Sequence, residues 1–289
     1  MPMSPAADVS ARLARLFVYP VKSCAGVEVR EAVLTETGLD LDRAWMVVDE
    51  QGVFVTQREL PRMALVKPTL KVHEVVLRAP GMLALHLAID TVEEPARVRL
   101  WDDEVPAFDM GDIAAQWFSD FLGRKLRLVR FDPEHRRLSN PKWTGGAEAL
   151  NQFNDGYPLL VASTASLDAL NAKLVAAGHA AVGIERFRPN LVIEGVEAHD
   201  EDRLDIIRIA AEAGEVQLRP VKPCPRCPIP NIDPATAEVD TIVTDTLQGY
   251  RSNAILGGAI SFGMNAIVVA GVDQVLKVGQ AVAANYRFD

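Results

Sequence analysis

The chain has 289 residues, of which 49% are apolar, enough to fill the cores of two domains of ordinary size. Thirty basic residues against thirty-nine acidic ones give a net charge of -9, which argues against general nucleic-acid binding and against attraction to anionic membranes. The first eleven residues have neither a signal-peptide nor a transit-peptide pattern, and no apolar run is as long as a membrane span, so we expect a cytoplasmic protein.

The first part of the chain is dominated by the pattern of β-strands. Runs rich in β-branched and aromatic residues predict strands at 16–19, 27–34, 44–49, 53–57, 70–76, 83–89 and 97–101. Gly52 suits a hairpin turn between the third and fourth of them. The spacing of Ile113, Trp117 and Phe121 predicts a packing helix over 112–122, ended by Gly123. Successive hairpins of this kind predict a closed or nearly closed antiparallel β structure.

A segment with neither strand nor helix periodicity, 131–146, predicts the boundary between two domains, at 12–130 and 147–285. Beyond it, three leucines on one face predict a helix over 164–177. Further strands are predicted at 191–194, 204–209, 216–218, 266–269 and 275–278. We therefore expect a mainly β fold of the α+β class: a β-barrel-like N-terminal domain and a second β domain with a few packing helices.

A proline-rich segment, 222–234, carries Cys224 and Cys227, two of the three cysteines. Five prolines in these thirteen positions fix φ and remove backbone donors, so we expect a stiff loop and neither a helix interior nor a central strand. Arg226, next to Cys227, would favour the ionised thiolate, the form that binds metals or attacks electrophiles. The pattern predicts that Cys227 presents a thiolate to a metal.

Four other interpretations of the two cysteines remain open. In the first, the two cysteines supply half of the ligands of a zinc site, although the remaining cysteine is Cys24 and the histidines show no ligand spacing. In the second, they form a dithiol redox centre, although such centres usually open a helix, which Pro228 and Pro230 disfavour. A structural disulfide is disfavoured by the low cysteine count and the lack of a secretory signal. Finally, a cysteine is often a small buried apolar residue.

Two clusters in the first half have the chemistry of an anion site. Lys22 and Ser23 place an ammonium and a hydroxyl side by side at a turn, which suits an anionic oxygen ligand, although lysines at turns are usually solvated. Arg43 and Arg58 lie at the ends of two strands expected to be neighbours, so both arginines could converge on one phosphate. The alternative is ordinary surface pairing with nearby carboxylates.

A third cluster, Arg186-Phe-Arg-Pro-Asn190, enters a predicted strand of the second half. Pro189 imposes an extended entry that could direct Arg188 and Asn190 into a cleft. In the alternative interpretation, Arg188 is an ion-paired residue at the edge of a strand.

Five motifs occur in one order along the chain. They are Tyr19-Pro-Val-Lys-Ser-Cys24, Asp42-Arg43-x-Trp45, Phe187-Arg-Pro-Asn190, Arg226-Cys227 followed by Asp233-Pro234, and Lys277-Val-Gly279. From residue 16 to about residue 282, the chain resembles proteins with a MOSC domain (molybdenum cofactor sulfurase C-terminal) preceded by a MOSC N-terminal β-barrel domain. Its pattern is most similar to the mitochondrial amidoxime reducing components and to their bacterial homologues that reduce N-hydroxylated compounds.

The resemblance implies a role for each matching residue. Cys227 would be the catalytic thiolate on molybdenum, completing a site made by the dithiolene of the molybdenum cofactor (molybdopterin) and by oxo groups. The residues expected to bind that cofactor, between the two domains, are Lys22, Ser23 and Arg43 on one side and Arg188 and Asn190 on the other. Thr56, Arg58 and Phe187 are added to this set as further candidates.

The resemblance also implies a molybdenum-cofactor-dependent oxidoreductase that removes an oxygen atom from a small N-hydroxylated or N-oxide substrate. Electrons would come from a separate ferredoxin, flavoprotein or cytochrome b5 type of protein, because the chain lacks the four cysteines of an iron–sulfur cluster. Proton donors are sought among Asp233, His199 and the acidic run 200–202. The alternatives are a sulfur or molybdenum-cofactor carrier that uses Cys227, and a binding module without catalysis.

The pattern departs from that of the amidoxime reductases in two ways. Pro225 replaces a small polar residue, and 228–231 replaces a more regular apolar and threonine run, so we expect different substrate access. The membrane anchor of those reductases is also expected to be absent.

Overall fold

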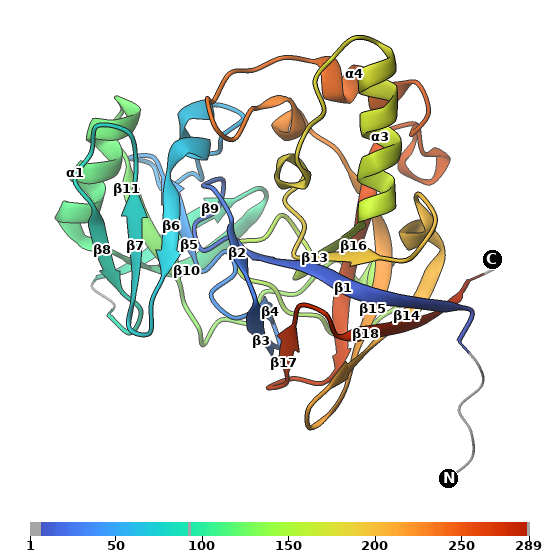
Figure 1. The fold of residues 1–289 in the computed structure, drawn as a ribbon. Helices are drawn as coiled ribbons and strands as arrows, with labels where there is room; N and C mark the ends of the chain where they lie inside the picture. The colour runs from blue at the N-terminus through green and yellow to red at the C-terminus, as the bar shows by residue number, and fades with distance from the viewer. Residues whose placement is uncertain (1–6, 92–93, 288–289) are drawn as a thin grey trace.

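The computed structural model describes residues 7–91 and 94–287. In Figure 1, one group of strands with helix α1 lies beside a second group covered by helices α3 and α4. No helix in the described part of the chain is both long enough and apolar enough to span a bilayer.

The second group is a closed barrel of seven strands. They are β1 (Val9–Val18), β12 (Leu159–Ser163), β13 (Leu191–Glu194), β14 (Leu204–Ala211), β15 (Gly214–Pro225), β16 (Ser261–Ala270) and β18 (Ala281–Tyr286). The order around the barrel is β1-β13-β12-β16-β15-β14-β18 and back to β1, and every neighbouring pair except β12–β13 is antiparallel. Short strand β2 (Val27–Val29) extends the sheet beside β1. Leucine, isoleucine and valine side chains fill the barrel.

The first group contains two smaller sheets. One is β5 (Trp45–Val48), β11 (Arg127–Phe131), β10 (Asp103–Asp109) and β9 (Pro95–Leu100), and the other is β6 (Lys67–Leu70), β7 (Glu74–Arg78) and β8 (Leu85–Ala88). Helix α1 (Gly111–Leu122) packs Trp117, Phe118 and Phe121 into the shared core and ends at Gly123, whose φ is 69°. Ile113, expected on the buried face, is 81% exposed, because Ala114 faces the core instead.

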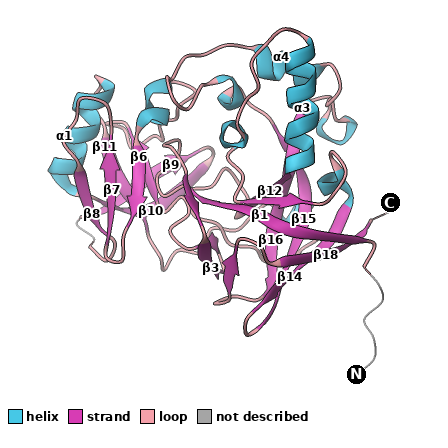
Figure 2. Ribbon diagram, in the orientation of Figure 1, coloured by secondary structure: helices cyan, strands magenta, loops and turns pink. Residues whose placement is uncertain are grey.

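A third small sheet and three further helices complete the fold. The sheet joins β3 (Glu31–Thr35) and β4 (Gly38–Leu39) to β17 (Val275–Lys277), near the other end of the chain. The helices are α2 (Pro141–Thr144), α3 (Thr164–Ala176) and α4 (Ile242–Gln248). Figure 2 shows α3 and α4 lying together outside the barrel strands. Leu170 and Leu174 bury one face of α3, as their spacing predicts.

The mainly β expectation is confirmed, but several predicted strands are wrong in extent. The run 27–34 is two strands separated at Arg30, and 70–76 is interrupted by a turn between β6 and β7. The expected strand 53–57 contains only isolated bridges at Val53 and Phe54. Strands β10, β11, β12 and β18 were not predicted. Strand β1 is longer than expected and pairs in the barrel of the second half, so the boundaries 12–130 and 147–285 stay a prediction.

The loop expected over 222–234 is wrong at its start, because β15 continues through Pro225 in the middle of the sheet. The register with β16 shifts between Pro220 and Lys222 and again between Pro223 and Pro225. Irregularities of this kind leave a backbone position outside the ladder, so a residue without an N–H can be accommodated. The strand therefore carries Cys224 at its end, and Cys227 follows in the loop before the short 3-10 turn Ile229–Asn231.

Candidate functional site

A pocket of about 120 Å³ is lined by loops of the first half and by residues of the second. It brings together all of the predicted site residues except Thr56, namely Lys22, Ser23, Arg43, Arg58, Phe187, Arg188, Asn190 and Cys227. A larger pocket of about 780 Å³ adjoins it and shares Arg58, Asp155, Tyr157 and Cys227 with it. Cys227 therefore lies on the wall that the two pockets have in common.

The cation beside Cys227 is Arg58, which comes from the other half of the chain. Burial alone would lower the pKa of Arg58, but Asp155 and the Cys227 thiol raise it. The expected pairing with Arg226 is wrong, because its guanidinium donates from Nη1 to Cys224 Sγ at 3.0 Å and from Nη2 to the Phe187 carbonyl oxygen at 3.0 Å. Successive residues leaving an extended strand point to opposite sides, so adjacency in sequence did not place Arg226 on Cys227.

Lys22 lines the smaller pocket and is buried, with 6% of its surface exposed. Its Nζ donates to the Phe153 carbonyl oxygen at 2.7 Å and to Asp155 Oδ1 at 2.5 Å. Burial lowers the pKa of Lys22 to about 8, although Asp155 acts in the opposite direction. Lys22 is therefore a cation whose charge depends on pH just above neutrality.

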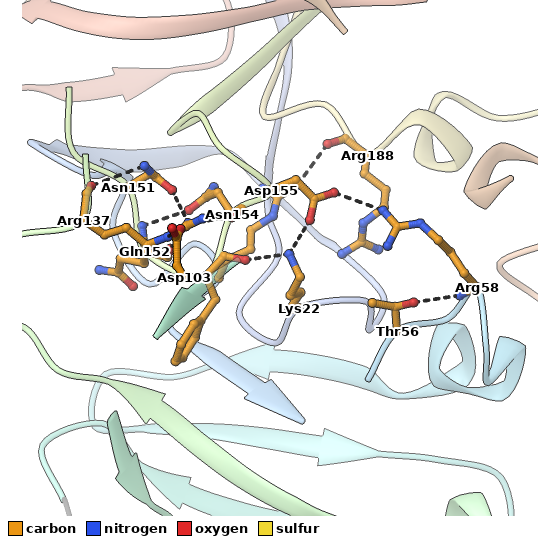
Figure 3. Close-up of polar contacts among 12 residues, drawn as sticks. Lys22, Thr56, Arg58, Asp103, Arg137, Asn151, Gln152, Asn154, Asp155 and Arg188 are labelled. Atoms are coloured by element: carbon orange, nitrogen blue, oxygen red, sulfur yellow. Dashed lines mark hydrogen bonds and ion pairs between the residues drawn. The ribbon is translucent and has the colours of Figure 1, made fainter. Parts of the chain in front are cut away.

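Asp155 was not among the predicted residues, yet it connects two cations of the pocket, Lys22 and Arg58. Figure 3 shows Lys22 and Arg58 directed at its carboxylate, and Arg58 Nη2 lies 3.2 Å from Oδ2. Partial burial alone would raise the pKa of Asp155, whose side chain is 55% exposed, but the two cations lower this pKa by more. The sequence signal for Asp155 was its position before Gly156 and Pro158, ahead of β12. That pattern indicates a turn but does not indicate an ion pair.

Two arginines flank one buried tyrosine. The guanidinium carbons of Arg43 and Arg188 each lie 4.3 Å from the centroid of the Tyr19 ring. Arg43 is also paired with Asp42, at 2.5 Å between Nη1 and Oδ2, so the expected carboxylate partner is present but buried. Burial, with Arg43 nearby, lowers the pKa of Arg188 to about 10. The positive charge of Arg188 is therefore less compensated by nearby negative charge than that of Arg43.

The other predicted residues differ in what they can offer a ligand. Asn190 accepts from the Leu160 N–H at 3.1 Å and donates to the Phe17 carbonyl oxygen at 3.2 Å, so its amide connects β1 to β12. Phe187 is buried and stacks on Phe262 with a centroid distance of 3.9 Å.

Two hydroxyl residues complete the predicted set. Thr56 lies outside the pocket, and its Oγ1 accepts from the backbone N–H of Arg58 at 3.3 Å. Ser23 lines the pocket, has a positive φ of 67°, and forms no side-chain hydrogen bond with any described residue. The Ser23 hydroxyl is thus available to a ligand, whereas Thr56 supports the turn that carries Arg58.

None of the expected proton donors lines either pocket. Asp233 pairs with Arg186 at 2.9 Å, and burial lowers the pKa of His199 to about 4 at a position against Tyr250 and Phe262. In the run 200–202, Asp200 accepts from Tyr286, Glu201 from two serines and Asp202 from Arg251. These carboxylates support the fold around α3 and α4.

The donor set was compared with the needs of the molybdenum cofactor. Within residues 7–91 and 94–287, no three His, Cys, Asp or Glu side chains are grouped so as to hold a metal ion. A metal in this pocket would therefore take most of its ligands from an organic cofactor, with Cys227 as the protein ligand. Lys22, Arg188 and the free Ser23 hydroxyl suit the phosphate of such a cofactor. The residues fit that group.

The chain is similar to known proteins over most of its length. The MOSC N-terminal beta barrel domain matches residues 10–125, and the MOSC domain matches residues 149–283. The chain is 35% identical over 251 residues to mitochondrial amidoxime reducing component 2 of Rattus norvegicus and 35% over 250 residues to mitochondrial amidoxime-reducing component 1 of Homo sapiens, with 83% of this chain and 72% of each relative covered. It is 29% identical over 269 residues to molybdenum cofactor sulfurase of Homo sapiens, covering 86% of this chain and 29% of that protein.

These relations support a function linked to the molybdenum cofactor. The two domain matches cover most of the chain, in the order expected from the five motifs. The chain therefore belongs to the MOSC family, as a protein that joins a MOSC N-terminal β-barrel domain to a MOSC domain.

Proposed function

We propose that the protein is a molybdenum-cofactor-dependent reductase of N-hydroxylated or N-oxide compounds. The observation that carries the proposal is the place of Cys227, on the wall between a cation-lined pocket and a larger adjoining one. In this arrangement the smaller pocket holds the cofactor and the larger one admits the substrate. Cys227 is then the one protein ligand to the metal, and it faces both pockets.

The cations of the smaller pocket bind the cofactor phosphate. Lys22, Ser23 and Arg188 supply donors that can turn to an anion, and Arg43 contributes a guanidinium already paired with Asp42. Asn190 and Phe187 act indirectly, because their side chains are engaged in the barrel and in the aromatic core. The cofactor site is thus built from both halves of the chain.

The reaction converts R–NH–OH, two electrons and two protons into R–NH2 and water. When bound, the molybdenum cofactor would supply the two-electron chemistry of oxygen-atom removal. Arg58 stabilises the negative charge on the Cys227 sulfur, and Lys22 holds an exchangeable proton at Nζ near neutral pH. A separate electron-donor protein, of the ferredoxin, flavoprotein or cytochrome b5 type, returns the electrons.

The test is to purify the protein from a host that makes the cofactor. Molybdenum, pterin and the reduction of an amidoxime by a reduced viologen dye are measured for the wild type, Cys227→Ser and Cys224→Ser. We expect Cys227→Ser to lose at least 100-fold in turnover, about the effect of removing a group that acts in the transition state, and Cys224→Ser to keep most of it. A loss of molybdenum in Cys224→Ser, with the fold intact, would contradict the single-ligand assignment.

The carrier function is separated from the reductase by the same preparation. Similarity to molybdenum cofactor sulfurase over the MOSC region is the observation that favours it. A persulfide on Cys227, found by mass spectrometry in protein without pterin, would support the carrier and refute the reductase. Bound molybdenum without turnover on any N-hydroxylated compound would lead to the same conclusion.

A further inference from the structure

The larger pocket contains a lysine, Lys222, whose charge no side chain in the described part of the chain neutralises. Lys222 lies on β15 opposite Asn265 of β16, two positions before Cys224, and lines this pocket together with Cys227. Its side chain is half-buried. Its Nζ lies 5.3 Å from the centroid of the Trp143 ring and 5.8 Å from that of the Tyr157 ring. The two aromatic rings hold the ammonium at the pocket wall by cation–π attraction.

Lys222 forms no ion pair and no hydrogen bond with any residue in the described ranges. Other cations of the same pocket do form such pairs: Arg58 with Asp155 at 3.2 Å, and Arg137 with Asp103 at 2.9 Å. Aromatic faces attract the charge but accept none of the three N–H donors well, so the ammonium keeps its hydrogen-bonding capacity for another partner. A half-buried cation without a carboxylate partner is unexpected in a chain with nine more acidic than basic residues.

Arg226 adds a second charge of the same kind. Its guanidinium lines both pockets and donates to Cys224 Sγ and to the Phe187 carbonyl oxygen, and it pairs with no Asp or Glu within residues 7–91 and 94–287. The wall on the β15 side therefore carries two positive charges, and neither is paired with an Asp or Glu of the described part of the chain. An anion entering this pocket would be attracted to that wall, and Lys222 has the free donors to bind it.

We propose that Lys222 is the binding site for an anionic group of the substrate, a carboxylate or a phosphate. The proposal rests on the reductase function and narrows it: the preferred substrate is an N-hydroxylated compound that also carries an acidic group. Trp101, in the same pocket, is 44% exposed and offers apolar surface for the body of such a molecule beside the Arg58 guanidinium, which lies 5.1 Å from the centroid of its ring.

The test compares two substrates that differ by one charge, benzamidoxime and 4-carboxybenzamidoxime, with the enzyme loaded with cofactor. For the wild type we expect a KM for the carboxylate about 10-fold or more below that for the neutral compound. Lys222→Met removes the charge at similar side-chain length and should raise the KM of the carboxylate by about 10- to 100-fold, the usual effect of losing a charged hydrogen bond. Lys222→Arg keeps the charge and should keep the preference.

Lys142→Met is the matched control. Lys142 Nζ also lies over the Trp143 ring, at 5.8 Å, but Lys142 lines neither pocket. The same loss of charge beside the same ring should therefore leave the preference for the carboxylate intact. Equal preference in Lys222→Met and the wild type would overturn the proposal, as would a loss of pterin from Lys222→Met, which would assign Lys222 to the cofactor.

A binding measurement keeps this proposal separate from the reductase function. Titration calorimetry with benzoate and with the neutral benzamide should show salt-dependent binding of benzoate to the wild type and a loss of about 10-fold or more in Lys222→Met. Benzoate binding through Lys222 without turnover of either amidoxime would support the anion site while refuting the reductase. Turnover of both amidoximes with equal KM would support the reductase while refuting the anion site.

Discussion

The ion pair between Lys22 and Asp155 allows the electrostatics of the pocket to be tested without any ligand. Burial lowers the pKa of Lys22 from 10.5 to about 8, so the charged ammonium destabilises the fold by about 3 kcal/mol even with Asp155 beside it. Asp155→Asn removes the carboxylate and leaves the Lys22 ammonium beside a neutral amide, which is a weaker partner. Because the Asp155 side chain is 55% exposed, we expect a cost of about 1–2 kcal/mol, below the 3–5 kcal/mol of a fully buried pair.

The sign of the pH dependence follows from the lowered pKa. Between about pH 8 and pH 10.5 the unfolded chain binds more protons than the folded one, so the contribution of Lys22 to stability improves as pH rises through this window. The interaction that Asp155→Asn removes exists while Lys22 is protonated, below about pH 8. We therefore expect Asp155→Asn to lower the melting temperature by about 2–6 °C near pH 6.5 and by less near pH 9.5, where the pair of Asp155 with Arg58 is what remains to be lost.

A second half-exposed aspartate provides the control. Asp103 is 54% exposed and pairs with the buried Arg137 at 2.9 Å, and an arginine keeps its charge throughout this pH range. Asp103→Asn should therefore have the same cost near pH 6.5 and near pH 9.5. Thermal melts of both variants at the two pH values decide the matter: a pH-independent cost for Asp155→Asn would refute the assignment of its effect to the charge of Lys22.

Two further substitutions, one of them with a glycine control, test how the pocket is supported. A Cβ at Gly26 would lie 2.4 Å from Tyr19 Cε1, so Gly26→Ala should destabilise the protein by about 1–3 kcal/mol through displacement of that ring. In Gly156→Ala the Cβ meets nothing within 4 Å and should change stability by less than about 0.5 kcal/mol; equal effects in urea unfolding would contradict the steric argument. Asn190→Ala removes the link between the Leu160 N–H and the Phe17 carbonyl oxygen and should cost about 1–3 kcal/mol. Unchanged exchange protection of the Leu160 amide would refute that role.

Local sequence patterns predicted the type of most elements but not the exact pairing. Helix 112–122 and helix 164–177 were predicted within a residue, because an apolar stripe and a terminal glycine are both local signals. Strands β10, β11 and β18 were missed, because a short strand is stabilised by its neighbours across the sheet and carries little signal of its own. The prolines of β15 led to the wrong prediction of a loop for the same reason. Register shifts against the neighbouring strand β16 accommodate them, and local sequence does not show those shifts.

The sequence predicted which residues belong to the site better than it predicted which of them contact one another. Turn and strand-end positions brought Lys22, Arg58 and Cys227 into consideration, and the structure places them around one pocket. Asp155 was missed because it lies 133 residues from Lys22 in sequence and nothing local marks it as a partner. Arg226 was assigned to the wrong thiol because side-chain direction is set by the end of a twisted strand, which spacing alone does not determine.

Closure of the barrel by β1 joins the two halves of the site. Near one end β1 pairs with β18, and further along it pairs with β13, where Leu16 lies opposite Leu191. The loop with Lys22 and Ser23 follows β1 directly, and Arg188 and Asn190 precede β13 directly. One pairing therefore sets the spacing between cations that are more than 160 residues apart in the chain, as the hydrogen bond from Arg188 to the Cys24 carbonyl oxygen shows. Residues such as Leu16, fully buried in the barrel and outside the pocket, help to set the positions of the pocket cations by holding that register.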